Sequence, residues 1–234
     1  MREWQLKSGD PLSLTLATDV RLSATDYSDD RCWELSLGGG DPAALALQTT
    51  YGLRARSMRL FPQFTLGETS ISDPAQFAQP PVVRQVFPNF IRVSFAPFPD
   101  IDVTAEYWVP QPHAIAGRFE FTNNATVNRI IQLDLIGQLN PTEGQRLAPL
   151  EISAVTVLNG WSGGLSPVVF MTGGPKAGSS SYPSLALKMD LAPENPRQVT
   201  WVHAAEKDRD ASFNLARSVA ANRWEAESSR IERL

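Results

Sequence analysis

The chain has 234 residues, of which 42% are hydrophobic and 20% are charged, and its formal net charge at pH 7 is −4. This composition favours a folded domain with a sizeable core and excludes a disordered chain. Charges of both signs are interspersed and no apolar run is long enough to span a bilayer, so the sequence predicts neither a nucleic-acid partner nor a membrane partner.

Most of the chain is predicted to form β-strands, because apolar and polar residues alternate with a period of two. The first such runs are residues 12–19 (LSLTLATD) and 31–37 (RCWELSL). Clusters of Gly, Pro, Asn and Asp separate the later runs, as expected for turns. These later runs are ALALQTTY, MRLFPQFTL, VVRQVFP, FIRVSFAP, IDVTAEYWV, IAGRFEFTN, RIIQLDLIGQL, ISAVTVL, PVVFM, LALKMDL and RQVTWVHA.

The succession of strands predicts an all-β fold, a large two-sheet antiparallel β-sandwich or supersandwich. No helical pattern separates the strands, which excludes a parallel α/β arrangement, because parallel strands need a crossover connection. A closed antiparallel barrel is the alternative. Bulky residues on both faces of residues 101–109 and 130–136 favour the sandwich, with sheets that other segments cover. The absence of a fixed-period repeat disfavours a propeller.

The chain ends in an Ala/Arg/Glu-rich helical pattern, residues 211–234. Asp208 or Asp210 is expected to cap the start of one continuous helix of about 22 residues, roughly 33 Å long. One stripe of the helix, spaced by three or four residues, must be buried against the sandwich's own outer face or against a following domain. The stripe consists of Phe213, Ala216, Ala220, Trp224, Glu227 and Ile231. Residues 1–208 are therefore predicted to form one sandwich domain, and residues 209–234 a C-terminal linker helix.

Metal and cofactor sites are not predicted. The chain has two histidines, His113 and His203, and a single cysteine, Cys32, which form no cluster with transition-metal spacing. Both histidines are interpreted as polar residues at turns. The segment GGPKAGS, residues 173–179, differs from a phosphate-binding loop because its lysine precedes the last glycine and no helix follows.

Catalytic residues are not predicted either. No GxSxG elbow occurs. Sugar hydrolysis needs two carboxyl groups that face each other across a cleft. Glu106, Glu120 and Asp134 lie in alternating strands, where a polar residue normally faces solvent, and the sequence gives no reason for any two of them to converge.

Tryptophan supplies the candidate contact residues. Trp33, Trp108 and Trp201 lie within predicted strands and are expected in the core. Trp161 instead lies in a Gly-rich loop, residues 159–165, where its ring needs a sugar, a neighbouring domain or a local hydrophobic pocket as a partner. The predicted carbohydrate or domain-interface residues are Trp161, Gly163, Gly164, Phe213 and Trp224.

Localisation is predicted to be cytoplasmic. Residues 1–14 (MREWQLKSGDPLSL) lack the uninterrupted apolar core of a signal peptide. A single cysteine allows no internal disulfide, which fits a reducing compartment.

Several segments in sequence resemble the N-terminal domain of bacterial glycoside hydrolases of the glucoamylase-like and glycogen-debranching-like kind. They are PVVRQVFPNFIRVSF, AEYWVPQPHAIAGRFEFTN, VTVLNGWSGGLSPVVFMTGGP, SYPSLALKMDLAP, VTWVHAAEKDRDASFNLAR and NRWEAESSRIE. The resemblance implies a supersandwich, then a linker helix that contains Trp224-Glu225, then an (α/α)6 barrel. In that family the barrel carries the general acid and base, so the resemblance places no catalytic residue in this chain.

What the resemblance implies for function is a non-catalytic domain of an enzyme that acts on α-glucan-like carbohydrate. Its partner would be the (α/α)6 catalytic domain of the same polypeptide and, as a weaker implication, an oligosaccharide. Two alternatives remain from the residues themselves: an independent carbohydrate-binding module, and a sugar epimerase, mutarotase or lyase built on a large sandwich.

Overall fold

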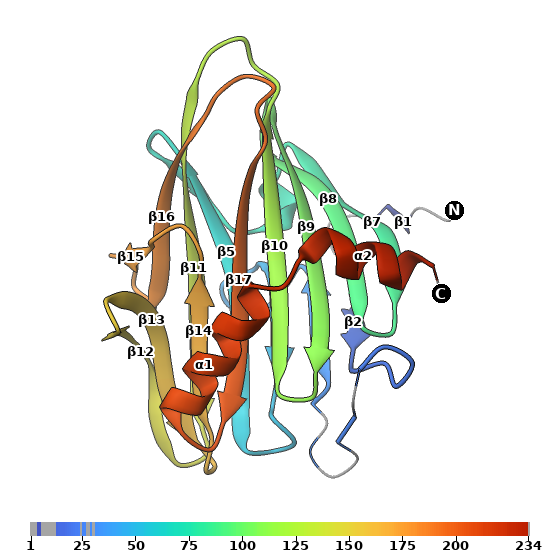
Figure 1. Cartoon of the computed structure of the whole chain (residues 1–234). Coiled ribbons are helices and arrows are strands. Elements are labelled where there is room, and N and C mark those ends of the chain that lie inside the picture. Colours follow the sequence, from blue (N-terminus) through green and yellow to red (C-terminus); the bar gives the residue numbers. More distant parts are fainter. Residues whose placement is uncertain (1–3, 6–12, 24, 27–28, 30, 234) are drawn as a thin grey trace.

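Two antiparallel β-sheets pack face to face in a large sandwich, and two helices follow the last strand (Figure 1). The structure, a computed structural model, describes residues 4–5, 13–23, 25–26, 29 and 31–233. Antiparallel pairing links every pair of neighbouring strands, so the predicted two-sheet antiparallel sandwich is confirmed.

The first sheet has nine strands in the order β1-β7-β8-β9-β10-β17-β14-β13-β12. Their bounds are β1 Trp4–Gln5, β7 Gln79–Phe87, β8 Phe90–Phe98, β9 Ile101–Gln111, β10 Ala114–Asn123, β17 Arg197–Glu206, β14 Ser166–Met171, β13 Val155–Ser162 and β12 Gly144–Ile152. Strand β12 forms one edge of this sheet, and most of its side chains are exposed.

The second sheet has eight strands, in the order β15-β16-β11-β5-β4-β3-β2, with β6 paired to β5. Their bounds are β15 Lys176–Ala177, β16 Ser184–Leu191, β11 Arg129–Pro141, β5 Ala55–Leu66, β4 Leu45–Thr49, β3 Trp33–Leu37, β2 Ser13–Leu16 and β6 Thr69–Ile71. A single 3-10 turn, Pro74–Gln76, precedes β7.

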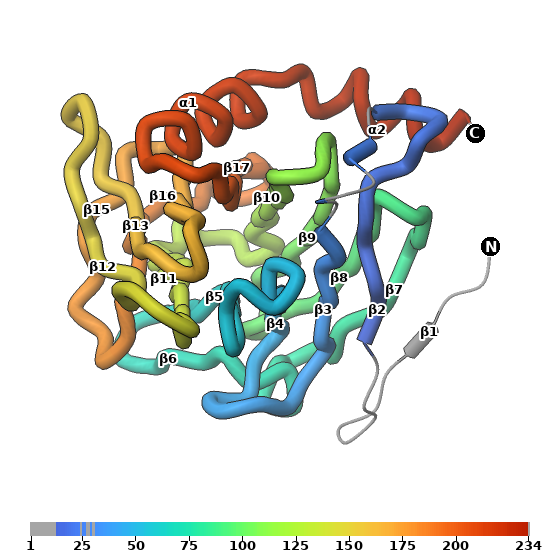
Figure 2. The backbone as a smooth tube through the Cα atoms, turned by 90° about the horizontal axis from the view of Figure 1, so that it is seen from below, coloured from blue at the N-terminus to red at the C-terminus, as the bar shows by residue number. Residues whose placement is uncertain are grey.

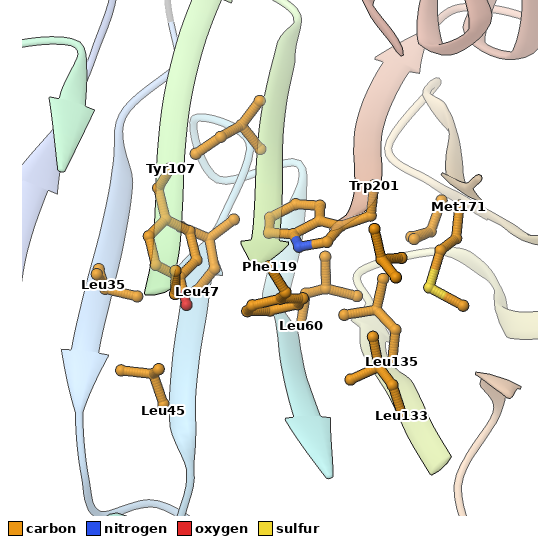
Figure 3. Close-up of a cluster of buried hydrophobic side chains, with 14 of the residues drawn as sticks. Leu35, Leu45, Leu47, Leu60, Tyr107, Phe119, Leu133, Leu135, Met171 and Trp201 are labelled. Carbon is orange, nitrogen blue, oxygen red and sulfur yellow. The ribbon is translucent and has the colours of Figure 1, made fainter. Parts of the chain in front are cut away.

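The main core lies between the two sheets, where side chains from both inner faces interdigitate (Figure 3). Trp201 on β17 and Phe119 on β10 contribute large rings from the nine-stranded sheet. Gly117 pairs with Trp201, and a Cβ on this glycine would lie 2.2 Å from two carbons of the indole ring. The absence of a side chain at residue 117 therefore makes room for Trp201 in the core.

The outer face of the nine-stranded sheet is also apolar, because the two C-terminal helices cover it (Figure 1). Trp108 alternates with Tyr107 along β9, so Tyr107 enters the main core while Trp108 packs beneath the helices. The bulky residues on both faces of residues 101–109 are thus explained. Trp33 and Trp201 confirm the prediction of core tryptophans, whereas Trp108 is buried on the opposite face of its strand.

The predicted single helix is divided into α1 (Arg209–Ala220) and α2 (Trp224–Glu232). Asp208 is the cap, and its side chain accepts a hydrogen bond of 2.8 Å from Ala211 N. The interruption at residues 221–223 changes the phase of the buried stripe. The buried residues are therefore Ser212, Phe213, Ala216, Val219, Trp224, Ser228 and Ile231, and not Ala220 or Glu227.

This stripe packs on the sandwich itself, which is the first of the two alternatives given above. Neither helix in the described part of the chain has the length and hydrophobicity needed to cross a bilayer.

One strand prediction and one loop prediction were wrong. The run ISAVTVL is not one strand, because Ser153 and Ala154 adopt positive φ angles of 50° and 61° and form the turn between β12 and β13. Turns with positive φ usually carry Gly, Asn or Asp, so Ser153 and Ala154 gave no sequence signal for this turn. Trp161 also lies in a strand and not in a loop, since β13 continues to Ser162 and only Gly163 and Gly164 form the tip.

Candidate functional site

Trp161 and the glycines after it lie at one end of the sandwich. The Trp161 side chain is 39% exposed, and its ring covers Gly144 of the neighbouring strand, where a Cβ would lie 2.1 Å from a ring carbon. A Cβ on Gly163 would lie 2.5 Å from the carbonyl oxygen of Arg54. Gly163 and Gly164, both with positive φ, therefore let this turn approach residue 54 closely. A role of these residues in binding carbohydrate or another domain stays a prediction.

Phe213 and Trp224 are held by the chain's own nine-stranded sheet. Phe213 packs with Val157 and Val168, and the Trp224 ring meets Trp108 edge-on with 5.7 Å between ring centroids. The indole nitrogen of Trp224 donates a hydrogen bond to the Glu106 carboxylate. Both side chains are at most 5% exposed, so a ligand would reach them only after the helices move.

A polar groove of about 360 Å³ runs along one side of α2. Its floor consists of outward-facing residues of β8, β9, β10 and β17, and α2 forms its wall. Ion pairs join the two: Arg118 Nη2 lies 2.6 Å from Glu225 Oε1, and Arg92 Nη1 lies 3.1 Å from Glu232 Oε1. The hydrogen bond from Arg118 lowers the pKa of Glu225 below its ordinary value.

Two of the three carboxylates considered above line this groove, namely Glu106 and Glu120. Glu106 was expected to face solvent, but it is buried. Arg92 binds its carboxylate at 2.7 Å, and Trp224 donates a hydrogen bond to it. Glu120 accepts a hydrogen bond of 2.6 Å from Gln198. Asp134 lies on the other sheet, where it is also buried and accepts from Gln132. Protein groups thus engage all three carboxylates.

His203 is buried within β17 and not at a turn, so that interpretation was wrong. Its Nε2 lies 2.7 Å from the Tyr51 hydroxyl, and its Nδ1 lies 3.2 Å from the carbonyl oxygen of Val168. A carbonyl can only accept, so Nδ1 donates to Val168 and Nε2 accepts from Tyr51. Burial lowers the pKa of His203 to about 3, so the ring is neutral at physiological pH. The pair is 0% exposed, and no substrate reaches it.

His113 does lie at a turn, at the end of the sandwich that Figure 2 views directly. Its Nδ1 is 2.9 Å from Glu206 Oε1, and its Nε2 is 3.5 Å from Asp29 Oδ2. Arg54 binds Asp29 at 3.0 Å. This cluster joins segments that are distant in the sequence.

Arg31 lies behind this cluster and is 2% exposed. Burial lowers its pKa, and Asp29, 3.8 Å from Nη2, opposes that effect. No motif in the sequence indicated that Arg31, Tyr51 or Glu206 would join the histidines. Within the described residues, no three or more His, Cys, Asp or Glu side chains are arranged to hold a metal ion.

No family model matches the sequence, and no curated protein matches it. Solved structures do resemble the fold. A putative kojibiose phosphorylase from the human microbiome superposes with a TM-score of 0.54 at 8% identity, over 73% of this chain and 27% of that chain. The Slr1438 protein from Synechocystis sp. PCC 6803 gives a TM-score of 0.53 at 11% identity, over 89% of this chain and 100% of that chain.

These likenesses concern the fold alone, because the identities are low. They confirm the sandwich that the resemblance in sequence implied. The present chain spans about a quarter of the phosphorylase, 27% of its length, but the whole of the Slr1438 protein. A sandwich of this kind therefore occurs both as one part of a longer chain and as the whole of a chain.

Proposed function

We propose that this chain is a non-catalytic sandwich domain of an enzyme that acts on α-glucan-like carbohydrate. It packs against a helical-barrel catalytic domain of the same polypeptide, with residues 1–208 as the sandwich and residues 209–234 as the link between the two. The observation that carries the proposal is the likeness to a segment of a putative kojibiose phosphorylase, which amounts to 27% of that larger chain.

The environments of the histidine and carboxylate side chains favour a non-catalytic role for this chain. His203 is inaccessible and neutral, and Glu106, Glu120 and Asp134 are engaged by protein groups. A glycosidase needs one carboxyl group that gives a proton and a second that acts as base or nucleophile, both free to meet the substrate. Carboxylates bound by Arg92, Gln198 or Gln132 are poorly suited to either role.

The test compares the 234-residue chain with the complete product of its natural reading frame. Both are incubated with maltooligosaccharides, with and without phosphate, and the release of glucose or glucose phosphate is measured. We expect turnover from the complete product and none from the 234-residue chain. Turnover by the chain alone, or a reading frame that ends at Leu234, would contradict the proposal.

A sugar epimerase or mutarotase is the second candidate, and one observation favours it. His113 and Glu206 contact each other at 2.9 Å on a partly exposed end of the sandwich, and an imidazole with a carboxylate can transfer protons at a sugar ring. Polarimetry of freshly dissolved glucose or galactose tests this candidate. It requires a catalysed mutarotation that His113→Ala removes and that Trp161→Phe leaves unchanged.

A further inference from the structure

The side of α2 opposite the polar groove holds a second hollow, of about 340 Å³. Trp108, Pro110 and Gln111 of β9 form its floor, and the ends of α1 and α2 form two walls. The third wall is formed by Leu22 and Ser23, in the segment that follows β2 and lies beside α2 in Figure 2, and the Leu22 carbonyl accepts a hydrogen bond from Arg230. We call this space the Trp108 hollow.

Its lining combines apolar side chains with polar ones, and the polar ones are the more numerous. Leu22, Trp108, Val219 and Ile231 supply apolar surface next to the indole. Ligand sites are typically concave, mainly apolar and supplied with a small number of placed polar groups, with volumes of about 300–1,000 Å³. The Trp108 hollow matches such sites in volume but is more polar, and uncharged amides and hydroxyls supply most of its polar groups, whereas the groove on the other side of α2 is lined mainly by charged side chains.

Three side-chain amides in the Trp108 hollow have unused hydrogen-bonding capacity. Asn89 is 1% exposed, and its Oδ1 has no partner in the part of the chain that the structure describes. A buried acceptor without a partner is destabilising, so such a group usually indicates a missing partner. Over the same described residues, the side-chain amides of Gln111 and Asn222 also form no hydrogen bond, and both line the hollow.

The charge of the hollow restricts its ligand. Among the described residues of the lining, the charged side chains are Glu227 and Arg230, which pair with each other at 3.4 Å. A charged ligand would find no free counter-charge, and its desolvation would remain uncompensated. A hydrocarbon ligand would leave the amides unpaired. Hydroxyl groups both donate and accept hydrogen bonds, as amides do, and a ring bearing them also offers an apolar face to an indole.

We propose that the Trp108 hollow binds a neutral, polyhydroxylated ring, that is, a hexopyranose unit. One face of the ring packs on the surface around Trp108, while its hydroxyl groups bond to the more accessible amides of Gln111 and Asn222. This inference goes beyond the proposed function, because the hollow lies wholly within this chain and binds its ligand whether or not a catalytic domain follows. It also replaces Trp161 as the sugar-contacting tryptophan.

The experiment titrates the 234-residue chain with glucose, maltose and maltotriose, followed by saturation-transfer NMR and tryptophan fluorescence. Trp108 lines the hollow and its ring contacts that of Trp224, so fluorescence reports the occupation of the hollow. With only a few polar contacts and an open site, we expect a Kd on the order of 1 mM. We expect Gln111→Ala and Asn222→Ala each to weaken binding about 3- to 10-fold, the effect of losing one neutral hydrogen bond.

Tyr182→Phe is the matched control, because it alters an exposed aromatic side chain outside the hollow, and it should leave binding unchanged. Trp108→Phe should abolish the fluorescence response, and circular dichroism of the same sample verifies that it folds. Three results would overturn the inference: no binding of any of the sugars, binding that Gln111→Ala and Asn222→Ala do not weaken, and binding that Tyr182→Phe removes. Equal binding of glucuronate or glucosamine would also overturn it, because the charge argument would then be wrong. All of these outcomes are independent of whether the complete product is an enzyme.

Discussion

His203 and Tyr51 close a polar contact inside the sandwich, 152 positions apart in the chain. Three groups surround the imidazole: the Tyr51 hydroxyl, the Val168 carbonyl and the edge of the Trp33 ring, whose centroid lies 5.2 Å away. Both ring nitrogens are thereby satisfied in the neutral state. Protonation would place an unpaired charge in this environment, which is why burial lowers the pKa of His203 to about 3.

This pKa predicts that stability falls in acid. In the unfolded chain a histidine has a pKa of about 6.5, so between about pH 6.5 and pH 3 the unfolded state binds a proton that the folded state does not. The free energy of unfolding should therefore decrease as pH falls through this range, by up to ~1.4 kcal/mol per pH unit, and should not respond to His203 above about pH 7.5.

Urea unfolding at pH 7.5 and pH 5 measures the effect. A His203→Gln variant keeps the same carboxylates. The difference in the free energy of unfolding between wild type and variant, compared at the two pH values, therefore isolates the effect of His203. Tyr51→Phe serves as the control, because it removes a hydrogen bond while leaving the titrating ring in place. The same loss of stability in acid for wild type and His203→Gln would show the assignment to be wrong.

Little of this residue-scale chemistry could be predicted from the sequence. The alternation of residues placed His203 in or near a strand. A period of two does not reveal that Tyr51, distant in the sequence, lies beside its ring. Glu106 shows the same limit: its alternation indicated a solvent-facing carboxylate, and a helix 118 residues later in the chain buries it through Trp224.

Helices α1 and α2 are attached to the same sheet by different forces. Helix α1 is capped by Asp208 and packs through Phe213, Ala216 and Val219. Helix α2 has no side-chain cap, and besides Trp224 and Ile231 it is attached by ion pairs and hydrogen bonds. A hollow lies along each side of it. The apolar attachment of α1 does not depend on salt, whereas the attachment of α2 partly does.

We therefore expect salt to loosen α2 before α1. Exposed ion pairs contribute about 0–1 kcal/mol each, and 1 M salt shortens the screening length to about 3 Å. Amide hydrogen exchange in α2 should become several-fold faster at high salt, while exchange in α1 stays unchanged. Arg118→Ala should produce the same acceleration at low salt. Arg209→Ala, which removes an exposed pair within α1, should not accelerate α2.

At this scale the sequence was informative for regular elements and not for their interruptions. The strands followed from alternation, and the helical segment followed from its spacing and from the Asp208 cap. The break at residues 221–223 carries no Pro or Gly, and it allows Trp224 to reach Trp108. The hairpin turn at Ser153 and Ala154 likewise lacks the usual Asn-Gly signal. Tertiary packing decided both positions.

For the whole molecule, the C-terminal segment completes the fold on one face. The outer face of the nine-stranded sheet carries a cluster of buried apolar side chains that α1 and α2 cover. Burial of each large side chain such as Phe213 or Trp224 contributes about 1.5–3 kcal/mol. Several such residues together match the total stability of a typical domain, about 5–15 kcal/mol.

Truncation tests this dependence. A chain ending at Glu206 should aggregate or lose its cooperative thermal transition, because the apolar face of the sheet becomes exposed. A chain ending at Asn222 keeps α1, and it should stay folded with a lower Tm. Size-exclusion chromatography and thermal circular dichroism measure both. A soluble, fully stable chain ending at Glu206 would contradict the view that the helices belong to the sandwich.

The fold class could be predicted for the whole molecule, while the candidate sites could not. Many short alternating strands without crossover helices leave few architectures, and the sandwich is one of them. The Trp108 hollow depends on three segments, residues 22–23, 89–111 and 218–231, that meet only after both helices have packed. No local pattern in the sequence encodes such a meeting.

Strand β12 has a consequence for how the molecule meets its own copies. The edge strand of an open sheet has unpaired backbone N–H and C=O groups, with which a strand from another copy could pair. Here that border carries Pro149, which has no amide hydrogen, and the oppositely charged Arg146 and Glu151. Addition of a strand from another copy at the β12 edge is thereby discouraged.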